Sequence, residues 1–224
     1  MTTASTAKNL PFRHNRLLQV LAVAFVIVFA LSGYQPVMPA DWWVENVLVF
    51  ILAAYLIATY RWLPMSQLSY VLVFVYLCMH EWGAHYRYGI DPLGEWMKQF
   101  QTTARNQFDR WVHCAFGLLM YYPYREILVR RGKIREPWAD WIPVLLLLAH
   151  GAGYELLEWG AAAVLSPETA EAFLALQGDP WDAHKDMLMA FVGAVAAMAI
   201  TVGARRLRRR RALTTAHAAR AKVA

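Results

Sequence analysis

The chain has 224 residues, of which 58% are hydrophobic and 17% are charged, and its formal net charge is +6. This profile is typical of a membrane protein and not of a soluble globular domain. The basic excess does not indicate a nucleic-acid partner, because the basic residues flank apolar segments.

Six apolar stretches follow one another along the chain. Each is close to the about 20 residues that a helix needs to cross a hydrocarbon core of about 30 Å. They are too long for barrel strands, and a bilayer accepts only helices or closed barrels. The sequence therefore predicts an all-α six-helix transmembrane domain over 17–204, between a tail at 1–16 and a basic tail at 205–224. The stretches are 17–34, 43–63, 67–88, 108–129, 139–165 and 183–204.

The first stretch follows Lys8, Arg13 and Arg16, and so also resembles a secretory signal peptide. Its apolar run is long for a signal peptide, and the residues after it form a poor cleavage site. We therefore expect a retained first helix.

The distribution of charge predicts the orientation. If both termini are cytoplasmic, only five of the 22 Lys and Arg lie on the outer side: Arg87, Lys98, Arg105, Arg110 and Lys185. Only three of the 16 Asp and Glu lie on the inner side: Glu126, Glu136 and Asp140. This imbalance follows the positive-inside rule and predicts an N-in/C-in protein of a bacterial inner membrane. We expect the basic run 205–211 to contact anionic lipid headgroups.

Two outer loops are long enough to cover a site on the periplasmic face. The loop 86–107 contains an amphipathic piece at 95–100, which suits a short interfacial helix. In the loop 166–182, Ser166 followed by Pro167 predicts a short helix over 167–176.

Ionisable residues gather in the outer halves of the last four stretches, where burial of a charge costs several kcal/mol unless a partner, a cavity or a metal compensates it. Their common depth predicts one buried polar site that faces the periplasm. The clusters are His80-Glu81-x-x-x-His85, Asp109-Arg110-x-x-His113, His150 with Glu155 and Glu158, and Asp179 with Asp182, His184 and Asp186.

Spacing suggests how these residues work together, because residues three or four apart share a helix face. Imidazole and carboxylate groups are the ligand set of zinc and similar divalent metals. The predicted ligands are His80, His85, Asp109, His113, Asp182 and Asp186, and the predicted catalytic carboxylates are Glu81, Glu155 and Glu158. His80 and His85 are five residues apart, about 140° around a helix, and so are not expected to share a metal.

Structural interpretations of the same residues remain open. Asp109 and Asp182 stand at helix starts and can act as caps. His184 can be solvated at the interface, and His150 can be a hydrogen-bonded core residue.

Glu155 and Glu158 lie well inside an apolar helix. Their structural alternative is pairing with Arg110 or His113. Cys78 and Cys114 lie at similar depth, so a disulfide is conceivable, although free thiols are expected.

Residues spread over most of the chain match one known family. They are the tract 154–159, the tract 177–187, Gly193-Ala194, His80, Glu81, His85, Tyr86, Asp109, Arg110 and His113. On these residues the chain resembles the YjdF-type predicted inner-membrane proteins of bacteria, over roughly residues 15–205. The resemblance implies a multi-helix membrane protein and carries no reaction with it. A fainter similarity, in the last two helices, is to the VanZ-like membrane proteins, although Ala190 stands near the place of their usual Asn.

Three functions fit these features. The first is a metal-dependent hydrolase or transferase that acts on a lipid or lipid-linked substrate. The second is a transporter of an ion or small molecule, which needs a polar path that the inner halves of the helices do not offer. The third is a scaffold whose polar groups pair only to stabilise the bundle. The sequence leaves the oligomeric state open.

Overall fold

The computed structural model describes residues 11–164, 170 and 173–221, and the residues it describes form helices and loops without a strand. The order is η1 (Phe12–His14), α1 (Arg16–Ser32), α2 (Pro39–Thr59), α3 (Gln67–Tyr86), α4 (Pro92–Met97), η2 (Lys98–Phe100), α5 (Phe108–Arg130), α6 (Trp138–Ala162) and α8 (Asp182–Ala221).

The long helices begin and end within a few residues of the six predicted stretches, except that α8 continues through the basic tail to Ala221. The predicted all-α class is therefore confirmed. The amphipathic piece at 95–100 falls in α4 and η2, as expected. Half of the residues of the helix predicted over 167–176, and the first ten residues of the N-terminal tail, lie outside the described residues.

Local sequence explains where several helices begin. The side chains of Asn15, Ser66 and Asp91 each accept a hydrogen bond from a backbone N–H in the first turn of the helix that follows. Helix α2 has a proline in its first turn, where no N–H is needed.

By length and composition, two helices are able to cross a bilayer, at Pro39–Thr59 and Asp182–Thr215, and α1 is apolar but shorter. Helices α3, α5 and α6 do not meet the combined criterion of hydropathy and low charge. Helix α5, for example, contains Asp109, Arg110, Arg125, Glu126 and Arg130. Hydropathy alone therefore supports two spans, and the six-span arrangement is not established by it.

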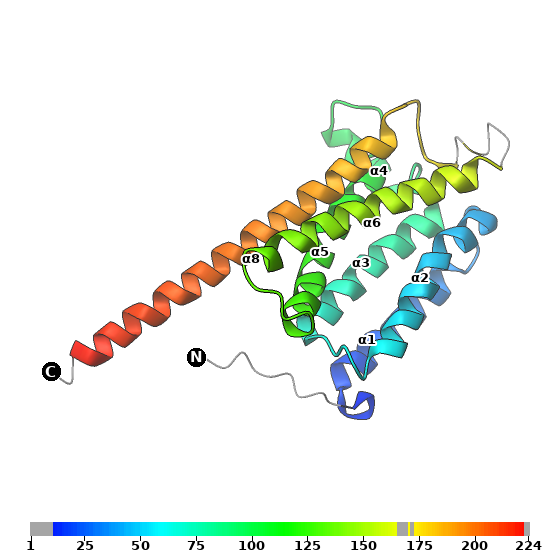
Figure 1. Ribbon diagram of the computed structural model, residues 1–224. Coiled ribbons are helices and arrows are strands. Elements are labelled where there is room, and N and C mark those ends of the chain that lie inside the picture. Colours follow the sequence, from blue (N-terminus) through cyan, green and yellow to red (C-terminus); the bar gives the residue numbers. More distant parts are fainter. Residues whose placement is uncertain (1–10, 165–169, 171–172, 222–224) are drawn as a thin grey trace.

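Helix α5 lies at the centre of the bundle, where it packs against α3, α6 and α8, while α3 also packs against α1 and α2. The described N-terminal segment and the end of α8 lie at one end of the bundle, opposite α4 (Figure 1). The middle of the bundle is an apolar core of Val49, Val73, Leu77, Met120, Tyr121, Val144, Leu147, Ala194 and Ala197.

Helices α5 and α8 approach each other through two glycines. A Cβ atom on Gly117 would clash with the carbonyl oxygen of Ala190, and a Cβ atom on Gly193 would clash with the carbonyl oxygen of Cys114. The helices therefore pack backbone against backbone, as small residues allow in membrane bundles.

Charged groups hold these helices together at the end of the bundle opposite α4, which we call the inner end. Asp140 of α6 binds Arg125 of α5 at 2.9 Å and Arg205 of α8 at 2.6 Å, and its backbone carbonyl accepts a hydrogen bond from Tyr121. At 1.5 Å per residue, Arg205 lies about 35 Å along α8 from Asp182. This distance is close to the thickness of a hydrocarbon core.

The glycine contact is tested by comparing two substitutions on α8. We expect Gly193→Leu to lower the free energy of unfolding by about 1–3 kcal/mol or more, because the side chain must force α5 away. Gly203→Ala, at a position with no neighbouring atom within 4 Å, should leave stability unchanged or raise it by up to about 1 kcal/mol. Denaturant unfolding of the purified proteins measures both, and equal effects would contradict the proposed packing.

Candidate functional site

Three helices bring metal-ligand atoms together at the end of the bundle that carries α4, which we call the outer end. The ligand atoms of Asp109, His113 and Asp186 all lie within 4.8 Å of one another. Glu155 of α6 approaches the same imidazole, with its Oε1 3.4 Å from His113 Nε2. We call these four residues the outer cluster.

The positions of the outer cluster follow from helix geometry. Asp109 and His113 are four residues apart on α5, so they share one face, and Oδ1 of Asp109 lies 3.5 Å from Nε2 of His113. Asp186 lies in the second turn of α8, beside the same part of α5. Asp186 and His113 are buried, with 2% and 8% of their surface exposed.

Two arginines beside the outer cluster are occupied by other carboxylates. Arg105 and Arg110 bind the two oxygens of Asp182, at 2.5 and 3.0 Å, and Arg110 also binds Asp179 at 2.7 Å. Hydrogen bonds from Lys185 and Arg110 hold the pKa of Asp179 well below its usual range. These ion pairs join the start of α5 to the start of α8 and the segment before it. Asp182 therefore belongs to this ion-pair network and not to the outer cluster.

The carboxylates of the outer cluster are poorly compensated. Apart from His113 itself, the nearest basic group among the described residues is Nε of Arg110, 3.9 Å from Asp186 Oδ1. That oxygen and Oε1 of Glu155 are buried and have no hydrogen-bond partner in the part of the chain that the structure describes. Buried acceptors without a donor are uncommon and indicate a proton or a cation that the protein itself does not supply.

Two more carboxylates lie beside the outer cluster. Glu45, buried in α2, accepts a 2.6 Å hydrogen bond from the hydroxyl of Tyr154, whose ring packs edge-on against His113. Glu158 lies near Tyr154 and close enough to Glu45 and Glu155 for electrostatic interaction. In the described chain, neither Glu45 nor Glu158 forms an ion pair with Lys or Arg, so the number of carboxyl groups without a basic partner rises further.

Two predicted residues of α3, Glu81 and His85, lie apart from the outer cluster. The carboxylate of Glu81 accepts a hydrogen bond from Ser32 of α1, and Nδ1 of His85 lies 2.8 Å from the carbonyl oxygen of the same serine. Trp42 donates to the hydroxyl of Ser32 at 3.0 Å. The expectation of one site formed by four helices is therefore only partly met, because Glu81 and His85 form a separate group that joins α1, α2 and α3.

His80 is buried and shares a 2.7 Å hydrogen bond with the hydroxyl of Tyr88, so it and His85 have different partners. The remaining candidates are peripheral. His184 and His150 are exposed, and Nδ1 of His150 lies 2.7 Å from the carbonyl oxygen of Leu146 in its own helix. Cys78 and Cys114 are free thiols.

Glu45 and Tyr154 are not among the site residues that the sequence predicts. Glu45 is a carboxylate in a long apolar stretch, so the criterion that singled out Glu155 applies to it equally. The partnership of Tyr154 depends on where α2 lies relative to α6, and residue spacing carries no information on that.

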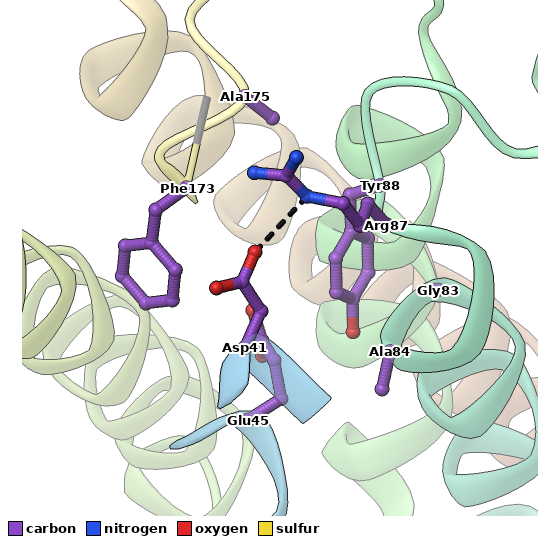
Figure 2. Close-up of a pocket in the computed structure, with 8 residues that line it drawn as sticks. All are labelled: Asp41, Glu45, Gly83, Ala84, Arg87, Tyr88, Phe173 and Ala175. Atoms are coloured by element: carbon purple, nitrogen blue, oxygen red, sulfur yellow. Dashed lines mark ion pairs between the residues drawn. The ribbon is translucent and has the colours of Figure 1, made fainter. Parts of the chain in front are cut away.

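A small pocket opens on the outer face, between α2, the end of α3 and the segment 173–175 (Figure 2). The space open to a water-sized sphere is about 10 Å³, which is close to what one water molecule needs. Glu45 lines this pocket and accepts a hydrogen bond from Tyr154. The ring of Tyr154 in turn contacts His113 of the outer cluster. The other lining residues are Asp41, Gly83, Ala84, Arg87, Tyr88, Phe173 and Ala175.

Comparison with known proteins indicates a membrane protein family. The profile of a family described as "Predicted membrane protein (DUF2238)" matches residues 17–209. The chain is 32% identical over 180 residues to the inner membrane protein YjdF of Escherichia coli strain K12, over 80% of this chain and 86% of that protein. No solved structure matches the chain at a significant level.

Substitution of Asp182 and of Asp186 tests whether these two aspartates of α8 have different roles. We expect Asp182→Asn to lower the free energy of unfolding by about 3 kcal/mol, because it removes the charge that holds two partly buried arginines. Asp186→Asn, one turn further on, should change stability by less than about 1 kcal/mol in metal-free protein, since it breaks no close ion pair. Unfolding of both variants after chelator treatment measures this, and a larger loss from Asp186→Asn would contradict the assignment.

Proposed function

Since the chain belongs to the DUF2238 family of predicted membrane proteins, we propose that it is a six-span membrane protein whose outer cluster binds a divalent metal ion such as zinc. The YjdF-type resemblance predicted from the sequence is confirmed by these matches, and the VanZ-like similarity stays a prediction. The observation that carries the metal proposal is the convergence of Asp109, His113 and Asp186, with ligand atoms within 4.8 Å and without a close basic partner.

The six-span arrangement is supported by the positions of the ten tryptophans. Every Trp lies within about one helical turn of a helix end, where the interfacial belt of a membrane protein is expected. Nine of them are among the exposed large hydrophobic residues, and Trp42 is the buried one. The outer end carries Trp42, Trp43, Trp82, Trp96, Trp111, Trp159 and Trp181, and the inner end carries Trp62, Trp138 and Trp141.

The orientation rests on charge. The exposed arginines of α8, from Arg206 to Arg211, lie at the end of the bundle opposite α4. Cytoplasmic placement of that end satisfies the positive-inside rule and brings these arginines to anionic lipid headgroups. The outer cluster then faces the periplasm of a bacterial inner membrane.

The chemistry that fits such a site is hydrolysis or group transfer on a lipid or lipid-linked substrate. A divalent ion held by Asp109, His113 and Asp186 would supply an activated water as the nucleophile. Glu158, beside the outer cluster, is suited to take up the proton that the nucleophile loses, as general base, and to return that proton to the leaving group of the substrate. His80, His85, Glu81 and Asp182 act in this proposal by supporting the bundle.

The alternatives have less support. A transporter needs a polar path across the bundle, and an apolar core separates the outer cluster from the inner ion pairs of Asp140. A scaffold explains Asp182 with its arginines and Glu81 with Ser32, but it gives no partner to the buried oxygens of Asp186 and Glu155.

Elemental analysis of the purified, zinc-equilibrated protein tests the metal proposal. We expect about one zinc per chain, and we expect His113→Ala and Asp186→Asn to remove most of it. His184→Ala, at an exposed histidine of the same helix as Asp186, serves as the matched control and should retain the metal. Wild-type protein without stoichiometric zinc, manganese or iron would refute the proposal.

Reporter fusions test the topology. Alkaline phosphatase needs disulfides that form only outside the cytoplasm, so it should be inactive at the C-terminus and active when inserted after Gln101. Green fluorescent protein at the C-terminus should fluoresce. An active C-terminal phosphatase fusion would exclude the N-in/C-in arrangement.

A further inference from the structure

The outer pocket contains a basic side chain that the outer cluster does not use. Nε of Arg87 lies 3.0 Å from Oδ2 of Asp41, and about one fifth of the arginine side chain is exposed. A guanidinium has five N–H donors. Among the described residues, no other partner binds this guanidinium, so its terminal nitrogens remain available to a ligand. Figure 2 shows these two nitrogens directed away from Asp41, on the side of Ala175.

The backbone of Arg87 is unusual as well. It follows the last residue of α3 with φ 64° and ψ 133°, a region that residues with a side chain rarely adopt. Such strain persists where the surroundings enforce it, and it concentrates at functional sites. Here the conformation turns the chain so that both Arg87 and Tyr88 line the pocket.

The two carboxylates of the pocket, Asp41 and Glu45, leave the terminal nitrogens of Arg87 available to an anion. Asp41 occupies only one edge of the guanidinium, and Glu45 already accepts the hydroxyl of Tyr154. The free edge of an arginine suits an anion with two adjacent oxygens, such as a phosphate. Because the pocket has room for about one water, the phosphate would bind at its mouth and not inside it.

The depth of the pocket indicates where such a phosphate comes from. Trp43 and Trp82 are exposed on the same ends of α2 and α3 as Asp41 and Arg87. Tryptophan at a helix end marks the level of the headgroups. Lipid phosphates are therefore available at the mouth of the pocket.

We propose that Arg87 binds a phosphate group at the mouth of this pocket and thereby holds a phosphate-bearing lipid next to the outer cluster. The connection from Glu45 through Tyr154 to His113 brings the two sites together. This inference rests on the proposed function, since it names the part of the substrate that is recognised.

The test uses calorimetric binding of two probes to the purified full-length protein in detergent. The probes are dihexanoyl phosphatidic acid, a short-chain lipid with a phosphate monoester headgroup, and inorganic phosphate. Arg87→Gly removes the guanidinium while glycine accepts the same backbone conformation. We expect this variant to remain folded and to keep its zinc content, and to bind both probes at least about tenfold more weakly, as loss of a charge-assisted contact implies. Lys98→Gln, at a basic residue of the same outer end that pairs with Glu95, is the matched control and should bind as wild type does.

The outcomes separate the possibilities. Tighter binding of the lipid than of inorganic phosphate supports a headgroup as the source, and equal binding supports free phosphate. Asp41→Asn should bind the probe at least as well as wild type, because it removes only the competing carboxylate. No binding by wild type, or unchanged binding by Arg87→Gly, overturns the proposal. The zinc content of the same samples shows separately whether the metal proposal holds.

Discussion

Charge that is buried in a membrane must be compensated, and the outer end of this bundle depends on how that is achieved. Asp182 and Asp179 are compensated within the protein, by Arg105 and Arg110. The carboxylates on the other side of Arg110 have no such partner in the described chain, and two of their buried oxygens have no hydrogen bond. The energetic cost of that arrangement is several kcal/mol unless protons or a metal ion remove it. Binding of a divalent cation by these groups would therefore contribute directly to stability as well as to chemistry.

The rest of the structure holds this region in place. The glycine contact between α5 and α8 sets the distance between Asp109 and Asp186, because a small change in helix separation moves both side chains. At the inner end, Asp140 ties together the same three helices that form the outer cluster. The apolar core lies between the two charged layers. Ion pairs thus hold the helices together at both ends of the bundle. The outer cluster can therefore contain polar groups that do not themselves stabilise the fold.

Much of this architecture was predictable from the sequence. Apolar length and continuity predicted all six long helices, and charge asymmetry predicted an orientation that the structure does not test. The pairing of Asp109 with His113 followed from their spacing on one helix.

What could not be predicted was which faces of the different helices contact one another. Glu81 and His85 have the same composition and spacing as a site pair, yet they contact Ser32 of α1, because the rotation of α3 is set by packing. Glu45 joins the site for the same reason, through contacts between distant helices.

The central claim is that His113 and the neighbouring carboxylates bind a divalent metal ion. X-ray absorption at the zinc edge of the zinc-loaded protein tests this most directly. The account predicts a first shell of nitrogen and oxygen atoms at about 2.0–2.2 Å, with the scattering of one imidazole that disappears in His113→Ala. A shell containing sulfur at about 2.3 Å, which would indicate Cys78 or Cys114, or an imidazole signal that is unchanged in His113→Ala, would contradict it.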